Sequence, residues 1–156
     1  MDKKIVIFDL DGTLALIDDR RDLATKDNGK FDWDVFFNPD NISLDVPNTP
    51  VIKMAQMLDS QGFNIVIFSG RSKSTYRTTR QWLIQNDVPF DTLQMRPNDR
   101  DSGGKFHFMK DSDLKQLWLD TIGKDNVAMV FDDRNQVVDM WRQNRLTCFQ
   151  VADGNF

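Results

Sequence analysis

The chain has 156 residues and a formal net charge of −4, with 20 Lys and Arg against 24 Asp and Glu. This length suits one domain that buries its own core, and the acidic total excludes a non-specific nucleic-acid coat, which needs a broad basic surface. One cysteine and one histidine exclude an internal disulfide, a zinc cluster and a two-histidine metal site. No apolar run reaches the length of a signal-peptide core or a membrane span, so we expect a cytoplasmic protein without membrane contact.

Short apolar runs alternate with stretches of helical spacing along the chain. Three continuous runs predict strands buried on both faces of a parallel sheet, and they cover residues 5–8, 65–68 and 127–131. Weaker strands are predicted over 92–95 and 146–151. Helices are predicted near 50–61, 73–86, 111–122 and 135–144. The alternation predicts an α/β fold in one domain over 1–156: a doubly wound, Rossmann-like, mostly parallel sheet flanked by helices.

Residues 14–49 interrupt this alternation after the first strand. A segment of that length is too long for a plain loop, so we expect a small insertion that forms a cap or a functional lid. It carries an aromatic group made of Phe31, Trp33, Phe36 and Phe37. We expect these rings to form the core of the lid, with stacking on a nucleobase as the alternative.

Acidic and phosphate-binding residue types follow three of the predicted strands. Asp9 and Asp11 come after the first strand, Ser69-Gly70-Arg71 after the second and Asp132-Asp133 after the third. Ligands of open α/β sheets bind at the carboxyl ends of the strands, so these groups are predicted to meet at one edge. Buried acids gathered there repel one another without a cation. Asp9 and Asp11 are two residues apart and can divide the work of nucleophile and acid–base.

The sequence around the first acids, Ile-Val-Ile-Phe-Asp9-Leu-Asp11-Gly-Thr13-Leu, resembles the first motif of the haloacid-dehalogenase (HAD) superfamily of phosphotransferases. Ser69-Gly70-Arg71 resembles its second motif, and Asp132-Asp133 its fourth. The stretches 95–110 and 132–156 are similar to the phosphatase half of phage-type polynucleotide kinase–phosphatases. The chain has no Gly-x-x-x-x-Gly-Lys-Ser/Thr sequence, so the resemblance does not extend to a 5′-kinase activity.

This resemblance implies a catalytic and metal-binding set. Asp9 is expected to attack phosphorus and form an aspartyl-phosphate, with Asp11 as the acid–base. Mg²⁺ is the implied cofactor, held by Asp9, Asp132 and the backbone carbonyl of Asp11. Asp133 is expected either at the metal or as the N-cap of the following helix. The family's lysine has three candidates here, and the sequence around Met109 favours Lys110 over Lys105 and Lys115.

The resemblance also implies a set of substrate-binding residues. Ser69 and the amide of Gly70 are expected to hydrogen-bond the phosphoryl oxygens, and Thr13 belongs to the same set. Arg71 and Arg96 are expected either to grip the substrate or to form surface salt bridges.

Three functions remain open from the sequence. The first is a Mg²⁺-dependent phosphatase that acts on phosphorylated nucleic-acid ends, with 3′-phosphate preferred by resemblance and no protein partner implied. The second is a HAD phosphatase for small phosphomonoesters such as 5′-nucleotides. The third is a HAD-like binding module without catalysis, which the complete motif set argues against.

The distribution of charge bears on the first of these functions. Residues 69–110 hold eight Lys or Arg against four Asp, which gives +4 and leaves −8 for the rest of the chain. The acidic total therefore excludes an extended basic surface for nucleic acid, but it is compatible with a local site that binds a few phosphates.

Overall fold

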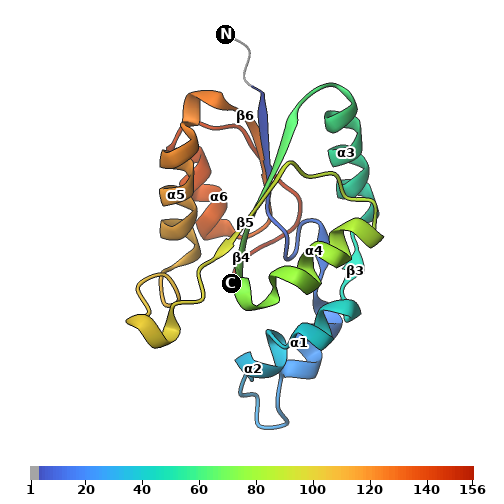
Figure 1. The fold of residues 1–156 in the computed structure, drawn as a ribbon, viewed down its shortest axis with the longest axis vertical. Helices are drawn as coiled ribbons and strands as arrows, with labels where there is room; N and C mark the ends of the chain where they lie inside the picture. The colour runs from blue at the N-terminus through green and yellow to red at the C-terminus, as the bar shows by residue number, and fades with distance from the viewer. Residues whose placement is uncertain (1–3) are drawn as a thin grey trace.

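The computed structural model describes residues 4–156 and contains a five-stranded parallel sheet in the order β5-β4-β1-β6-β7 (Figure 1). The strands are β1 (Ile5–Phe8), β4 (Asn64–Ser72), β5 (Thr92–Arg96), β6 (Val127–Asp132) and β7 (Cys148–Gln150). The chain builds one half of the sheet outward from β1 and then crosses over to build the other half. The carboxyl end of β1 therefore lies at the topological switch point, where such sheets bind ligands.

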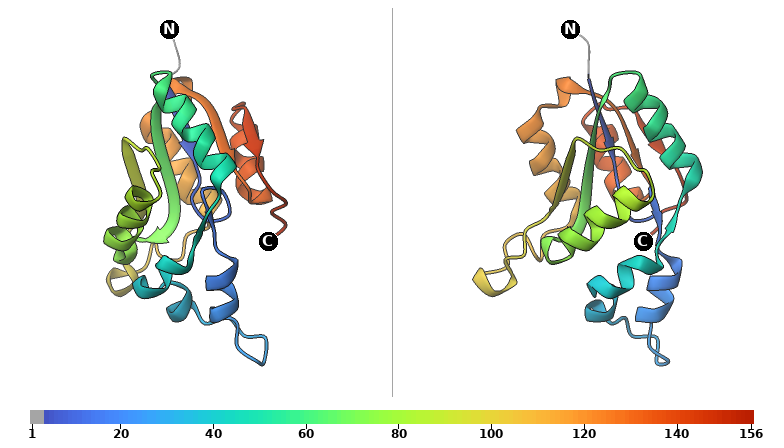
Figure 2. Two further views of the ribbon diagram at one scale, coloured as in Figure 1. Left: turned by 90° about the vertical axis from the view of Figure 1, so that its right-hand side faces the viewer. Right: turned by 45° about the vertical axis from the view of Figure 1, so that its right-hand side comes forward.

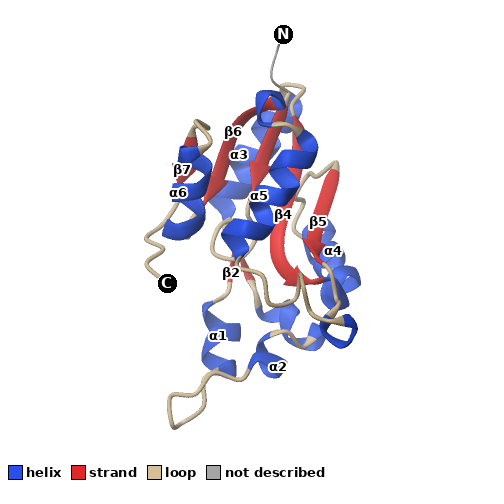
Figure 3. Cartoon of the chain, turned by 90° about the vertical axis from the view of Figure 1, so that its left-hand side faces the viewer, coloured by secondary structure: helices blue, strands red, loops and turns tan. Residues whose placement is uncertain are grey.

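Two helices cover each face of the sheet (Figure 3). They are α3 (Thr49–Ser60) and α4 (Tyr76–Gln85) on one face, and α5 (Asp111–Ile122) and α6 (Asn135–Gln143) on the other. The side chains of β1 alternate between the layers, because Val6 and Phe8 join the core under α3 and α4, whereas Ile7 joins the core under α5 and α6. The predicted doubly wound α/β fold is confirmed.

Several predicted elements differ in detail from the observed ones. The strand expected over 65–68 extends to Ser72, so Ser69, Gly70 and Arg71 belong to β4 and do not follow it. The strand expected over 146–151 is limited to β7.

The helix expected over 73–86 begins as a 3₁₀ turn, η2 (Lys73–Thr75), before α4. On α5 the apolar spacing predicts Leu117 on the inward face, but Leu117 is exposed, and Leu114, Lys115 and Leu119 are buried. Lys115 thus takes an inward position on α5, where its ammonium pairs with carboxylates at the sheet edge. Within residues 4–156, no helix combines the length and the apolarity that crossing a membrane requires.

The segment after β1 forms a module beyond the carboxyl edge of the sheet (Figure 2). Its base is the antiparallel pair β2 (Ala15–Leu16) and β3 (Val46–Pro47). Between these strands lie α1 (Asp18–Ala24), α2 (Trp33–Phe36) and the 3₁₀ helix η1 (Pro39–Leu44). η1 packs against α4, where the indole N–H of Trp82 donates to the Asp45 carbonyl at 3.0 Å. The insertion is thus anchored to the main body.

The remaining 3₁₀ turns are η3 (Arg100–Ser102), inside the loop over residues 97–110, and η4 (Lys124–Asn126), just before β6. The loop over residues 97–110 connects β5 to α5 and lies at the same end of the molecule as the insertion (Figure 1). These two segments therefore flank the carboxyl edge of the sheet.

Candidate active site

Three aspartates meet at the carboxyl ends of β1 and β6. Asp9 follows β1, Asp132 ends β6 and Asp133 comes next, and the backbone N–H of Asp9 donates to the Phe131 carbonyl at 2.9 Å. Each of the three is buried and offers one oxygen that lies within 4.8 Å of the others. The structure brings these three predicted site residues together because β1 and β6 are parallel neighbours in the sheet.

The lysine at this cluster is Lys115. Its Nζ lies 2.8 Å from Asp9 Oδ1 and 3.1 Å from Asp132 Oδ2, and only 2% of the residue is exposed. Lys110 is exposed at the N-cap position of α5 and Lys105 is exposed in the preceding loop. The prediction that Lys110 reaches Asp9 is therefore wrong. Five positions along a helix turn a side chain by about 140°, so the two lysines occupy different faces.

The charges at the cluster set its protonation. Burial, and next the charge of Asp132, raise the pKa of Asp9 well above its usual range, although Lys115 opposes them. Burial also raises the pKa of Asp133. Burial alone would lower the pKa of Lys115, but the carboxylates of Asp132 and Asp9 outweigh it and raise that pKa. Three buried acids against one lysine leave an excess of negative charge, which suits a hard divalent cation with oxygen ligands.

Neighbouring donors hold these carboxylates in place. The hydroxyl of Thr13 lies 3.3 Å from Asp133 Oδ1 and 3.4 Å from Asp9 Oδ2, and it can donate to either. Thr13 is completely buried, so it positions the acids rather than reaching out to a substrate. The indole N–H of Trp141, a buried residue of α6, donates to Asp132 Oδ2 at 3.1 Å. These contacts fix the orientation of the site before any ligand enters.

Asp133 stands at the cluster and does not cap the following helix. The N-cap position of α6 is Arg134, which offers no side-chain cap bond, so the helix-cap alternative is wrong. Gly12 makes the close approach of Asp133 possible, because a Cβ at Gly12 would lie 2.1 Å from Asp133 Oδ2. Its φ of +82° also suits glycine.

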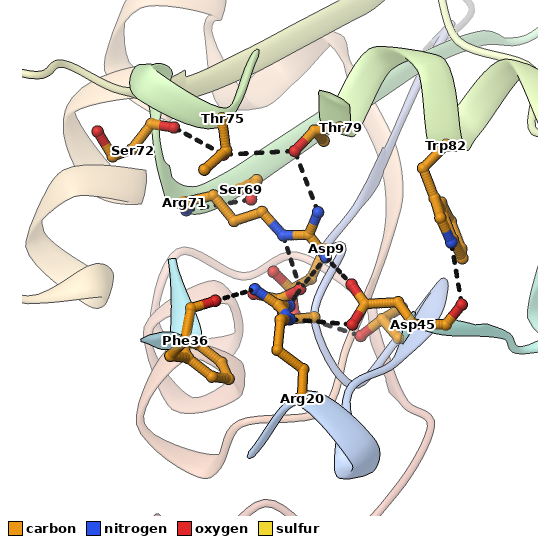
Figure 4. A network of polar contacts seen from close by, with 12 residues as sticks. Asp9, Arg20, Phe36, Asp45, Ser69, Arg71, Ser72, Thr75, Thr79 and Trp82 are labelled. Atoms are coloured by element: carbon orange, nitrogen blue, oxygen red, sulfur yellow. Dashed lines mark hydrogen bonds and ion pairs between the residues drawn. The ribbon is translucent and has the colours of Figure 1, made fainter. Parts of the chain in front are cut away.

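The Asp11 carboxylate pairs with two arginines, Arg20 and Arg71, which also contact Asp45 (Figure 4). Arg71 Nε and Nη2 donate to Asp11 Oδ1 at 2.9 and 2.5 Å, and Arg20 Nη2 donates to the same oxygen at 3.0 Å. Both arginines also bind Asp45, at 2.9 Å from Arg20 Nε and 2.6 Å from Arg71 Nη2. Burial by itself raises the pKa of Asp11, but the charges of Arg71 and then Arg20 outweigh it and lower that pKa.

Arg20 and Asp45 are site residues that the sequence did not reveal. Both come from the insertion, and Arg20 is completely buried, with its guanidinium 4.3 Å from the ring centre of Phe36. They lie 25 positions apart in a segment without a strong pattern, and a fully buried arginine becomes visible only when its partners are known. Arg71 forms salt bridges with Asp11 and Asp45, as one of its two predicted roles required, but these salt bridges are buried rather than at the surface.

The second motif forms the opposite wall of the site. Ser69 is buried at β4, and its Oγ accepts from the backbone N–H of Arg71 at 3.2 Å. Gly70 lies beside the loop that leads into α5, and a Cβ there would come within 2.7 Å of Asp111 Oδ1. The Gly70 backbone therefore packs so closely against the Asp111 side chain that a larger residue would not fit there.

Arg96 holds the loop over residues 97–110 in place through hydrogen bonds. Its Nε donates to the Gly70 carbonyl at 2.9 Å and its Nη1 to the Met109 carbonyl at 2.7 Å, while Nη2 pairs with Asp111. The residue is 8% exposed, so its ion pair with Asp111 matches the predicted salt-bridge role but is largely buried rather than at the surface. Its guanidinium is already occupied by protein partners.

A cavity of about 1220 Å³ opens over Asp9. Its walls come from the sheet edge, from the insertion and from the loop over residues 97–110, and Asp9, Asp11, Lys115 and Asp132 lie among its lining residues. Small-molecule pockets commonly measure about 300–1,000 Å³. The cavity therefore has room for more than the reacting phosphate and one small group.

The doubly wound sheet, the paired Asp9 and Asp11 at its switch point and the Lys115–Asp132 partners of the first acid together define a phosphatase of the HAD superfamily, which is a phosphomonoester hydrolase. The model of the polynucleotide kinase PNKP phosphatase domain matches residues 3–156. The chain belongs to this family.

Two relatives are more than 30% identical to the chain over the aligned residues. A protein of Autographa californica nuclear polyhedrosis virus, named a candidate bifunctional polynucleotide kinase/RNA ligase, is 37% identical over 153 residues. These cover 96% of the chain and 19% of the viral protein. A chain in the structure of the Pnkp1/Rnl/Hen1 complex matches 99% of this chain with 34% identity and a TM-score of 0.74. The chain spans 47% of that second relative.

A third match extends to the wider fold. The crystal structure of a predicted phosphatase from Clostridium acetobutylicum superposes with a TM-score of 0.67 over 95% of this chain and 84% of its own, at 14% identity. At that identity the likeness shows the fold alone.

Proposed function

We propose that the chain is a Mg²⁺-dependent phosphatase that removes the 3′-phosphate from the end of a nucleic acid. The observation that carries this proposal is Asp9, held by Lys115 at the floor of a cavity larger than a small ester needs. Membership of the polynucleotide kinase PNKP phosphatase family supports the same substrate. We expect the chain to act in the cytoplasm, which would be that of a host cell if the chain is encoded by a phage.

In the first step a carboxylate oxygen of Asp9 forms a bond to phosphorus, and the bond from phosphorus to the 3′-oxygen breaks. Because the charges of Arg71 and Arg20 outweigh burial and lower the pKa of Asp11, its carboxyl has to take up a proton from solvent before this step. It then gives that proton to the leaving oxygen, and an aspartyl-phosphate remains on Asp9. Arg20 and Arg71 hold the Asp11 carboxyl in place through the contacts described above. Lys115 offsets the repulsion between the Asp9 carboxylate and the incoming dianion.

In the second step Asp11 takes a proton from a water molecule as the water oxygen attacks phosphorus. The bond between Asp9 and phosphorus breaks, inorganic phosphate leaves and the Asp9 carboxylate is restored. Gly70 lines the cavity beside Asp9, and its backbone N–H and the Ser69 hydroxyl are expected to contact the phosphoryl oxygens. The backbone N–H of Arg71 would orient the Ser69 hydroxyl, to which it donates.

The metal fits the residues present. Asp9, Asp132 and Asp133 would hold Mg²⁺, with the Asp11 backbone carbonyl as a further hard oxygen ligand. When bound, the ion supplies positive charge that stabilises the phosphoryl oxygens in the transition state. The insertion over residues 14–49 would serve as a small cap, because it already ties Arg20 and Asp45 to the acid–base.

The test is release of phosphate from a 3′-phosphorylated oligonucleotide, with and without EDTA. We expect release that EDTA abolishes and Mg²⁺ restores. A parallel panel of mononucleotides separates this function from a phosphatase for small esters. Turnover of free mononucleotides with no release from the oligonucleotide would overturn the nucleic-acid substrate, and the absence of turnover on every ester would favour a binding module.

A further inference from the structure

Two strongly exposed aromatic side chains line the cavity over Asp9. Trp33, in the insertion, is 61% exposed, and Phe108, in the loop over residues 97–110, is 74% exposed. Burying such rings is worth several kcal/mol in an ordinary core, yet both stay open to solvent. They come from two separate segments that border the same cavity, so folding stability alone does not account for their placement.

Trp33 is held as a rigid surface. Its ring stacks on Phe37 at 5.7 Å between centroids, with an interplanar angle of 16°, and contacts the Phe31 ring edge to face at 4.6 Å. The Asp32 side chain accepts the backbone N–H groups of Asp34 and Val35 and so fixes the turn that carries Trp33. The expected lid core is thus built from the other rings of the group, while most of the Trp33 indole stays uncovered.

Phe108 is held in a similar way by its own loop. Asp99 accepts the backbone N–H groups of Phe106 at 2.9 Å and of His107 at 2.8 Å. The backbone N–H of Phe108 donates to the Gly104 carbonyl at 3.1 Å, and the Phe108 ring lies where a Cβ on Gly104 would be, at 2.7 Å. The loop therefore presents an ordered aromatic side chain, so ligand binding does not carry the entropic cost of ordering that side chain.

The charges beside these rings suit a polyanion. Arg100 lines the cavity near Phe108, is exposed and has no ion pair among residues 4–156. Arg21 lines the cavity on the side of the insertion. A single strand offers alternating bases and phosphates, and proteins bind it by stacking bases on aromatic rings and pairing phosphates with cations.

We propose that Trp33 and Phe108 are stacking platforms for unpaired bases next to the 3′-phosphate, so that the substrate is a single-stranded nucleic-acid end. This inference rests on the proposed function and specifies its substrate. In a duplex the bases stack on one another and their faces are not available, whereas an unpaired end can place its terminal base against Trp33. Stacking is tolerant of base identity, so the platforms distinguish a nucleic acid from a small ester without reading its sequence.

The test compares Trp33→Ala and Phe108→Ala with the wild-type protein on a 3′-phosphorylated single-stranded oligonucleotide and on p-nitrophenyl phosphate. Leu23→Ala is the matched control, since Leu23 is 55% exposed on the same insertion but outside the cavity lining. We expect each platform variant to raise KM for the oligonucleotide about 5- to 100-fold, with kcat and the turnover of p-nitrophenyl phosphate close to wild type. Trp33→Phe should restore most of the loss.

An oligonucleotide whose last residue is abasic supplies the second readout. The wild-type protein should lose kcat/KM on this substrate, and Trp33→Ala should treat it like the intact oligonucleotide. Unchanged KM in both platform variants, or an equal loss on p-nitrophenyl phosphate, would overturn the inference and leave the proposed function standing. Equal wild-type turnover of a blunt duplex would overturn the single-stranded substrate. No release from any oligonucleotide by the wild-type protein would overturn the proposed function together with this inference.

Discussion

Lys115 Nζ lies 2.8 Å from Asp9 Oδ1, although the two residues are 106 positions apart in the sequence. The pair joins α5 to the end of β1 across the edge of the sheet. Asp132, which accepts from the same ammonium at 3.1 Å, completes a buried triad. The nucleophile is therefore paired with a lysine whose place depends on the packing of α5, and this lysine opposes the effects of burial and of Asp132 on the Asp9 pKa.

Replacing this lysine tests the triad directly. Lys115→Met should lower kcat for phosphate release by about 10²-fold or more, because a preorganised positive charge beside the phosphate is lost. The free energy of unfolding should also fall by about 3–5 kcal/mol, since the carboxylates lose their buried partner. Steady-state kinetics and urea unfolding, each with and without Mg²⁺, measure the two effects.

Lys110→Met is the matched control for that experiment. It removes an exposed lysine of the same kind five residues away, so activity and stability should stay near wild type. An active Lys115→Met together with an inactive Lys110→Met would restore the sequence-based assignment of Lys110.

Asp9→Asn tests both the nucleophile and the electrostatics of the cluster. Turnover should disappear, because an amide cannot form the aspartyl-phosphate. The folded-state pKa of Asp9 is raised, so between the usual aspartate pKa and the raised value the folded state binds more protons than the unfolded state. The wild-type protein therefore loses stability as pH rises through that window, and Asp9→Asn should flatten the loss.

The measurement is urea unfolding of the metal-free protein at pH 5 and pH 8. Metal-free Asp9→Asn should be at least as stable as wild type at the higher of the two pH values, because the wild-type protein loses stability as pH rises above the usual aspartate pKa. If the variant unfolds at a clearly lower urea concentration than wild type at pH 8, the inference that the buried carboxylates carry more negative charge than Lys115 offsets is contradicted. Residual turnover above background would count against Asp9 as the nucleophile.

Removal and return of Mg²⁺ tests the three-carboxylate site without any assay of turnover. Mg²⁺ at about 100 times its dissociation constant should add about 2.7 kcal/mol to the free energy of unfolding and raise Tm accordingly. Asp133→Asn, which changes one of the three clustered acids, should shrink that shift. Equal Tm shifts in the two proteins would place the ion elsewhere.

Arg71→Lys tests the positioning of the acid–base. Arg71 bonds Asp11, Asp45 and Thr79 with separate N–H groups, and one ammonium cannot reach all three. We expect a loss of roughly 1–3 kcal/mol of stability and a fall in kcat of about 10²-fold from the misplaced Asp11. Arg77→Lys, at an exposed position on α4, is the control. Wild-type kcat in Arg71→Lys would contradict the positioning role.

Local patterns in the sequence were enough for the fold and for half of the site. The runs at 5–8 and 127–131 are apolar throughout because their strands are buried on both faces, so they read as parallel strands. Asp9, Asp132 and Asp133 could then be placed together, because the ends of parallel strands meet at one edge. These are consequences of residue type and short-range spacing, which the sequence contains by itself.

Only the tertiary structure decided which charges meet. Lys115, Arg20 and Asp45 each sit beside partners far away in the sequence, and nothing in their local pattern marks a buried charge. The positive stretch 69–110 illustrates the same point. Arg71 and Arg96 form ion pairs with Asp11, Asp45 and Asp111 inside the protein. Arg100, which lines the cavity, forms no ion pair with any of the described residues. The net charge of a segment is a property of the sequence, but its partners depend on how helices and loops pack across the sheet.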